Sequence, residues 1–255
     1  MGIEFGSFQL AYIALVILLS CVIKTSIGVG SGLFFSAALF LVIPPKVAIA
    51  LGGPVMIISD MMPMIHYCKK IDKKVFLILI SGSIAGLFLG AVIVNHMPDW
   101  LFIKLMGLIC GVFAVHQLVR NYLSRFLKSS GKKRYVPGKW MGVAAGLVGG
   151  VFTFMVHTGG VVYSIYMLSL NLSKTVFVGT IVAVFFSANC IKNVIYWKMG
   201  LLTPDLLIIV VWMIPFMIVG SFAGYFIHKK ISSAFFETLI LAFVLVASFR
   251  LILFS

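Results

Sequence analysis

Long apolar runs alternate with short polar segments along the whole chain. Five runs precede residue 120 and five follow residue 139, and a basic linker, Arg120–Lys139, separates the two sets. A helix needs about 20 predominantly apolar residues to cross the hydrocarbon core of a bilayer, so the longer runs predict transmembrane helices. The ten predicted helical runs are Phe8–Ile23, Leu33–Ile43, Val47–Ile65, Val75–Val94, Leu101–Val119, Trp140–Met155, Val161–Leu170, Thr175–Trp197, Leu206–Ile227 and Phe235–Phe254.

Two of these runs are too short to cross a bilayer. Leu33–Ile43 and Val161–Leu170 have about half the required length, and each follows a break that contains glycines. We therefore predict that each broken segment forms a re-entrant hairpin, which enters the membrane and returns on the same side. Such backbone is tolerated only where protein or a water-filled cavity satisfies its polar groups.

The two halves of the chain share this layout of two short runs followed by three longer ones. They also align in detail, because Gly32 matches Gly160 and Lys46 matches Lys174 at a spacing of 128, and Gly86 and Gly90 match Gly220 and Gly224 at a spacing of 134. Three crossings in each half is an odd number, so the halves would be inverted relative to each other, as in many transporters. We predict an all-α polytopic membrane protein with an N-terminal repeat at 1–119, a linker at 120–139 and a C-terminal repeat at 140–255.

Composition supports a lipid environment. The chain is 62% hydrophobic and 10% charged, whereas a soluble domain carries about 25% charged residues. The net charge of +14 does not indicate nucleic-acid binding, because the basic residues lie between apolar runs and form no single solvated face. The N-terminus has Glu4 in place of a basic segment and predicts no cleaved signal peptide. We expect a multi-pass protein of the cell (inner) membrane whose partner is the lipid bilayer.

The distribution of basic residues predicts the orientation in the membrane. With re-entrant hairpins, fourteen basic residues share one side, and they come from Lys69–Lys74, Arg120–Lys139, Lys174 and Lys229–Lys230. The loops of the opposite side hold Lys46 and Lys198. If each broken segment crossed once, the split would be twelve to four, so the positive-inside rule favours the hairpins. If each broken segment crossed the membrane twice, every loop would stay on the same side as with a re-entrant hairpin, so the charges do not distinguish these two arrangements. The linker is thus predicted to be cytoplasmic and both termini to be outside.

The two breaks are candidate anion sites. Each would present the N-terminus of a short helix, where free backbone N–H groups and the positive end of the helix dipole favour an anion. Tips that enter from opposite faces would meet near the midplane. The predicted binding residues of the two tips are Gly28, Gly30, Ser31, Gly32, His157, Thr158, Gly159 and Gly160. The alternative is that these glycines only allow tight turns or close helix packing.

Ionisable residues inside apolar runs are functional candidates by default. Lys192 would contact the anion and Asn189, on the same helix face, would add a donor; the alternative is a lysine that extends to the interface. Asp60 would couple proton movement, or form an ion pair with a lysine, or pack in its protonated form. His157 would titrate near neutral pH or donate one hydrogen bond. Lys24 lies near the first tip.

These residues resemble the sulfite exporter TauE/SafE family, also called TSUP, over essentially the whole chain. The similar stretches are Gly28-Val-Gly30-Ser31-Gly32, Thr158-Gly159-Gly160, Pro44-Pro45-Lys46, Asp60 with His66-Tyr67 and Lys69-Lys70, and Ala188-Asn189-Cys-Ile-Lys192-Asn193 with Tyr196 and Gly200-Leu201-Leu202-Thr203-Pro204. The last stretch is the most specific. Ser31 and His157-Thr158 depart from the glycines that are usual in the family.

The resemblance implies a secondary transporter of a small anion such as sulfite, a sulfonate or a carboxylate, with no enzymatic activity. We expect no cofactor and no metal. A passive anion channel is an alternative, and an intramembrane enzyme is a second one, which would need Ser31 in contact with His157.

Two further sequence features bear on assembly and redox state. Four scattered cysteines without CxxC spacing, Cys21, Cys68, Cys110 and Cys190, are interpreted as thiols packed in the membrane. Small residues at four-residue spacing, Gly82, Gly86 and Gly90, predict close helix contacts. Those contacts would lie within one chain or in a homodimer.

Overall fold

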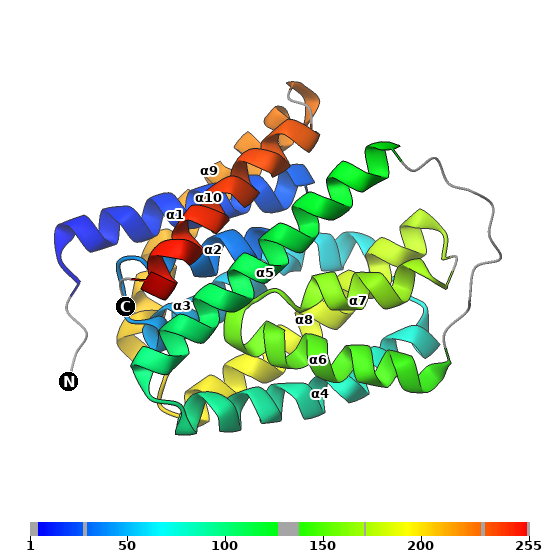
Figure 1. Cartoon of the computed structure of the whole chain (residues 1–255), viewed down its shortest axis with the longest axis horizontal. Helices are drawn as coiled ribbons and strands as arrows, with labels where there is room; N and C mark the ends of the chain where they lie inside the picture. Colours follow the sequence, from blue (N-terminus) through cyan, green and yellow to red (C-terminus); the bar gives the residue numbers. More distant parts are fainter. Residues whose placement is uncertain (1–4, 28–29, 127–137, 171, 231–232, 254–255) are drawn as a thin grey trace. The chain divides into compact units, whose positions relative to one another are not determined.

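A computed structural model describes residues 5–27, 30–126, 138–170, 172–230 and 233–253 of the chain. The regular structure within these residues is entirely α-helical (Figure 1). The helices are α1 Ser7–Ile27, α2 Ser31–Leu39, α3 Pro45–Tyr67, α4 Lys73–His96, α5 Asp99–Phe126, α6 Lys139–Val156, α7 Gly159–Leu168, α8 Lys174–Lys198, α9 Pro204–Lys230 and α10 Ser233–Leu253. Each predicted run corresponds to one helix, so the all-α prediction is confirmed.

Within the described residues, length, hydropathy and charge together identify the transmembrane candidates, and α3 and α10, two of the predicted crossings, are not among them. In the part of the chain that is described, six helices are long and apolar enough to cross a membrane: α1, α4, α5, α6, α8 and α9. In contrast, α2 and α7 have 9 and 10 residues. Because α1 has 21 residues and is about 31 Å long, the first arm of its hairpin could reach across a bilayer. The depth of the two hairpins in the membrane stays a prediction.

Both broken segments fold as helical hairpins. In the first, the Tyr12 hydroxyl near the start of α1 donates to the Ala38 carbonyl oxygen near the end of α2, at 3.0 Å. In the second, Gly149 of α6 packs against the Tyr163 ring of α7. The two short helices begin at Ser31 and Gly159, 128 residues apart. This is the spacing at which the sequence of the two halves aligns.

The first break is shorter than the sequence suggests. Helix α1 continues to Ile27, so Lys24 lies in its last turn. The Thr25 hydroxyl donates to the Cys21 carbonyl at 2.7 Å, and the next residue makes the same type of bond. Such bonds to carbonyls four residues back keep polar residues compatible with a helix. Gly30 precedes α2 with φ of +91°, a left-handed conformation that glycine adopts without strain.

The helices group into two compact units, and both units combine pieces from both halves of the sequence. Unit 1 comprises Met1–Ala48, Met97–Lys133 and Trp212–Ser255, and unit 2 comprises Ile49–His96 and Arg134–Val211. These units are defined by spatial contacts, whereas the predicted repeats 1–119 and 140–255 are defined by sequence correspondence. The inverted relation of the repeats stays a prediction.

Closely packed glycines join helices from different halves within each unit. In unit 2, α4 lies beside α6 (Figure 1), and a Cβ atom added at Gly86 would lie 2.0 Å from the Leu147 carbonyl oxygen. In unit 1, a Cβ added at Gly220 of α9 would lie 2.4 Å from the Leu18 carbonyl oxygen of α1. Backbone contact this close excludes any side chain. The contacts of Gly82, Gly86 and Gly90 are therefore made within one chain.

Helices α4, α6 and α8 of unit 2 begin at the same end. Gly82 and Gly86 contact Val143 and Leu147 in the same order along α4 and α6. Val75 and Leu79 of α4 share a core cluster with Ile181 and Val184 of α8. We call this the basic end of unit 2, because it carries Lys69, Lys70, Lys73, Lys74, Lys139 and Lys174. Lys198 ends α8 at the opposite end, as the charge partition predicts.

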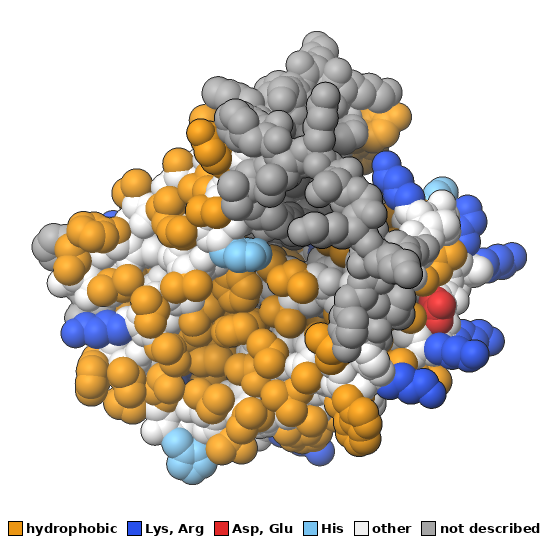
Figure 2. All heavy atoms as spheres, turned by 45° about the vertical axis from the view of Figure 1, so that its right-hand side comes forward, with side chains coloured by type: hydrophobic (Ala, Val, Ile, Leu, Met, Phe, Trp, Pro, Cys, Tyr) orange, Lys and Arg blue, Asp and Glu red, His pale blue; other side chains and the backbone are white. Residues whose placement is uncertain are grey.

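Charged side chains are unevenly distributed over the face drawn in Figure 2. Figure 2 shows a broad apolar face with basic side chains gathered mainly at one edge, and an acidic side chain among them.

Helix α5 continues to Phe126, which is seven residues into the predicted linker 120–139. The first helix-breaking glycine after it is Gly131, so a boundary drawn from hydropathy alone ends this helix too early. Residues 127–137 of the linker lie outside the described residues.

Replacing Gly86 with Ala tests the contact between α4 and α6. We expect Gly86→Ala to destabilise the protein by about 1–3 kcal/mol, because its methyl group displaces the backbone of α6. Gly111→Ala is the control, since a Cβ there would meet Ser248 at an ordinary 3.4 Å. Thermal unfolding in detergent measures both variants. Equal unfolding temperatures for the two would contradict the proposed backbone contact.

Candidate functional site

Unit 2 contains a buried chain of polar side chains from three helices. Asp60 comes from α3, Asn189 and Lys192 from α8, and His157 from the residue that ends α6. Lys192 has no exposed side-chain surface, and the other three residues are each less than a tenth exposed. The structure thus brings together four residues that the sequence singled out separately. We call these residues the polar chain.

Asn189 links the two opposite charges of the polar chain. Its Nδ2 donates to Asp60 Oδ2 at 2.8 Å, and its Oδ1 accepts from Lys192 Nζ at 2.8 Å. A carboxylate only accepts and an ammonium only donates, so this orientation of the amide satisfies both. Burying a charge costs several kcal/mol unless it is paired and hydrogen-bonded. The amide therefore helps to make both buried charges tolerable.

His157 continues the polar chain beyond Lys192. Its Nδ1 lies 2.7 Å from Lys192 Nζ. When Lys192 is protonated it can only donate, so Nδ1 is then the acceptor and the ring proton of a neutral imidazole is on Nε2. Protonation of Nδ1 would remove the acceptor and place two cations in contact. This contact therefore depends on a neutral imidazole.

The backbone directs the imidazole of His157. This residue has φ of +54°, the one positive φ outside glycine in the described part of the chain. The N–H of the next residue, Thr158, donates to the Phe152 carbonyl at 3.3 Å and closes α6. The Thr158 hydroxyl donates to the Val156 carbonyl at 2.8 Å. A left-handed histidine persists only where its surroundings hold it, and here the bond to Lys192 is part of those surroundings.

The rest of the second tip follows His157 directly. Thr158 is the N-cap residue of α7, and its side chain accepts no hydrogen bond from the backbone N–H groups of the first turn. The first backbone N–H groups of a helix have no acceptor within the helix and favour an anion. The tip thus places helix N–H groups next in sequence to the residue that contacts Lys192.

The glycines of this tip are explained by packing. A Cβ at Gly159 would lie 2.0 Å from Thr153 Oγ1, and one at Gly160 would lie 2.1 Å from the ring of Phe185. The packing interpretation therefore accounts for both glycines. Evidence for an anion site comes from the N–H groups and from Lys192.

The first tip belongs to unit 1. Ser31 and Gly32 are buried in the first turn of α2, and Gly30 precedes it. Gly28 lies outside the described residues. Lys24 is partly buried at the end of α1. Each unit is described by itself, so a meeting of the two tips at the midplane stays a prediction, and so does a contact of Ser31 with His157.

Several contacts of the polar chain involve residues that the sequence reasoning missed. Lys192 Nζ donates to the Thr153 carbonyl at 3.5 Å and lies 5.9 Å from the centre of the Tyr196 ring. Tyr196 donates in turn to the Phe154 carbonyl. Tyr196 lies four residues after Lys192, so helical periodicity could have identified it. A backbone carbonyl such as that of Thr153 carries no sequence signal.

The Thr153 hydroxyl belongs to a second buried group. It lies 3.3 Å from the Tyr163 hydroxyl, which also accepts a hydrogen bond from Ser83 at 3.0 Å. These three residues come from α6, α7 and α4. They connect the hairpin to α4 by polar contacts and hold the second tip in place.

Comparison with known proteins gives one result. The family model of the sulfite exporter TauE/SafE matches residues 13–251. No curated protein and no solved structure matches the chain. The matched region includes the polar chain, the second hairpin and the first hairpin from residue 13 onward. Because the match covers almost the entire length, the chain belongs to the sulfite exporter TauE/SafE family of membrane transporters for sulfite-type anions.

Proposed function

We propose that this protein is a secondary transporter that binds a small anion beside Lys192 and the N-terminus of α7. The observation that carries the proposal is the full burial of Lys192, whose Nζ lies 2.7 Å from Nδ1 of His157 at the second tip. A lysine inside a membrane helix is costly and marks a substrate pathway by default. The substrate would be sulfite, an organosulfonate or a related oxyanion or carboxylate.

Binding combines one full charge with backbone donors. The N–H groups of Gly159 and Gly160 are at the start of α7, where the helix dipole is positive. Charged groups interact more strongly in a low-dielectric interior than in water. An anion that takes the place of the Thr153 carbonyl, which lies 3.5 Å from Lys192 Nζ, would gain the ammonium without breaking the bond to Asn189.

Asp60 and His157 are the coupling residues of the proposal. Asp60 reaches Lys192 through one amide, and His157 contacts it directly. Adding a proton to either residue changes the charge balance around Lys192, because Asp60 loses its negative charge or His157 loses its acceptor. Proton movement would thereby alter the affinity of Lys192 for the anion.

The proposed orientation follows the basic residues. By the positive-inside rule, the basic end of unit 2 would face the cytoplasmic side of the cell (inner) membrane. The linker 120–139 would then be cytoplasmic and both termini would be outside. Lys192 is the 19th of the 25 residues of α8, counted from the basic end. The polar chain would therefore lie beyond the middle of this helix, towards the outer face.

Flux measurements separate a transporter from a passive anion channel. A transporter shows uptake that saturates with anion concentration and responds to a pH gradient. A channel shows neither. The family assignment favours the transporter.

Replacing Lys192 with Met tests its role in anion binding. We expect Lys192→Met to lower kcat/KM for sulfite uptake into proteoliposomes by at least about tenfold, because a buried charged partner is lost. Lys198→Met is the control, since Lys198 is exposed on the same helix. Elution as a single species from size exclusion checks that both variants fold. Undiminished uptake by folded Lys192→Met would refute the assigned role.

Replacing Asp60 with Asn tests coupling. The new amide oxygen can still accept from Asn189, so the fold should be retained while the negative charge is lost. We expect Asp60→Asn to take up anion at a rate that no longer depends on an imposed pH gradient. Asp205→Asn, at an exposed position in the first turn of α9, should keep the dependence. A pH response of Asp60→Asn equal to that of the original chain would exclude Asp60 as the coupling residue.

A further inference from the structure

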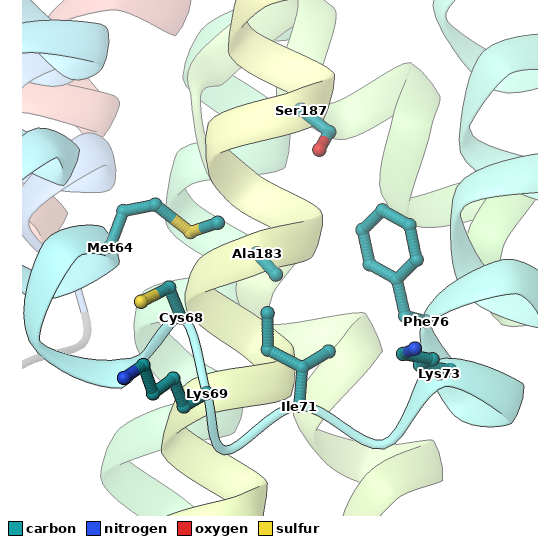
Figure 3. A pocket seen from close by; sticks show the side chains of 8 residues that line it. All are labelled: Met64, Cys68, Lys69, Ile71, Lys73, Phe76, Ala183 and Ser187. Atoms are coloured by element: carbon teal, nitrogen blue, oxygen red, sulfur yellow. The ribbon is translucent and has the colours of Figure 1, made fainter.

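Unit 2 contains a pocket at its basic end, where the turn between α3 and α4 meets α8 (Figure 3). Its volume is about 340 Å³, which lies in the range of about 300–1,000 Å³ that is typical of pockets for organic ligands. The lining residues are Met64, Cys68, Lys69, Ile71, Lys73, Phe76, Ala183 and Ser187. None of them belongs to the polar chain.

The wall of the pocket is held in place by specific contacts. The backbone N–H of Asp72 donates to Thr180 Oγ1 of α8 at 2.9 Å. A Cβ atom at Gly179 would lie 2.2 Å from the Lys70 carbonyl oxygen, so the turn lies directly on α8. These contacts fix the turn between α3 and α4 against α8. The pocket is therefore preformed.

The pocket has an apolar interior and a basic rim. Met64, Ile71 and Phe76 supply the apolar surface, and Figure 3 shows the lysines beside the turn and Ser187 farther along α8. Lys69 and Lys73 are exposed, and neither has a carboxylate within ion-pairing distance among the described residues. Clefts lined by one sign of charge concentrate ions of the other sign.

The single acid in this turn does not neutralise the rim. Asp72 Oδ1 accepts from the backbone N–H groups of Lys74 and Val75, at 2.9 and 3.0 Å. It thereby caps the start of α4, where a negative charge is stabilising. The two rim lysines remain available to an anion from solution.

Along the axis of α8, the pocket lies between the basic end and the level of the polar chain. Met64 is one helical turn from Asp60 on α3, on the side of the basic end. On α8, Ser187 precedes Asn189 by two residues and Lys192 by five. At about 1.5 Å per residue, Ser187 and Lys192 are only about 7.5 Å apart along the helix axis.

We propose that this pocket is a second anion-binding site, which receives organic anions with a compact apolar group before they reach Lys192. The rim lysines would hold the carboxylate or sulfonate, and Phe76, Ile71 and Met64 would cover the apolar group. A bare inorganic oxyanion leaves this apolar surface uncovered and binds more weakly. That an anion binds in this pocket before it reaches Lys192 rests on the proposed transport function. That the pocket binds such an anion at all does not depend on transport.

Two double variants of the full chain test the site. Lys69→Gln/Lys73→Gln removes the rim charges, and Lys70→Gln/Lys74→Gln removes two exposed lysines of the same turn that do not line the pocket. In detergent, the rate at which N-ethylmaleimide alkylates the exposed thiol of Cys68 reports whether the pocket is occupied. The Cys68→Ser variant identifies the part of the alkylation signal that comes from Cys68. Benzenesulfonate is the probe, and inorganic sulfate is the anion without an apolar group.

We expect benzenesulfonate to slow alkylation at a concentration at least about tenfold below that of sulfate. Removal of the rim charges should raise the half-protecting concentration of benzenesulfonate about three- to tenfold, because two exposed ion pairs are lost. The control pair should change it less than about twofold. Equal effects of the two variants, or equal protection by sulfate, would overturn the proposal.

Two further measurements separate this proposal from the proposed function and from lipid binding. If Cys68 is protected while no anion is taken up by proteoliposomes, the pocket stands and the transport function fails. If sulfite uptake is normal and Cys68 is not protected, the pocket proposal fails alone. Protection in nanodiscs by phosphatidylglycerol, without protection by benzenesulfonate, would assign the pocket to a lipid headgroup and overturn the proposal.

Discussion

The ammonium group of Lys192 is enclosed by protein, so the chain itself must provide its partners. This requirement accounts for much of the local structure of unit 2. Asn189 is oriented so that one amide serves Lys192 and Asp60 together. His157 adopts a left-handed backbone that ends α6 and turns its ring towards the lysine. Because the buried charge is stable only with these partners, a proton or anion that alters one of the partners also alters the stability of that charge.

The features of unit 2 follow one another along α8. The pocket with Ala183 and Ser187 comes first from the basic end, and Asn189 and Lys192 follow. Glycine allows this arrangement to be compact, since Gly179 lets the turn between α3 and α4 rest on α8. Charge is exposed at the rim of the pocket and buried at the polar chain.

The sequence was sufficient for the fold and for part of the site. Apolar runs and glycine breaks predicted every helix, because hydropathy and backbone freedom are local properties of a segment. Asp60, His157, Asn189 and Lys192 were singled out as polar residues in apolar surroundings. Asn189 was placed on the same helix face as Lys192, but the contacts between helices were not predictable, because Asp60 and Asn189 are 129 residues apart and no local pattern links them. The Thr153 carbonyl and the pocket were missed because each depends on how helices pack.

The glycine contacts described above constrain how the molecule can move. The backbone of α4, from the first half of the sequence, touches that of α6 from the second at Gly86 and Leu147. In the same way α9 touches α1 at Gly220 and Leu18. If the helices of the first half slid past those of the second, both of these backbone contacts would be lost. Empty space would then open beside each glycine, which has no side chain to fill it. Any rigid body that keeps these contacts contains helices from both halves, so a gene duplication that supplied the helices would not by itself define such a body.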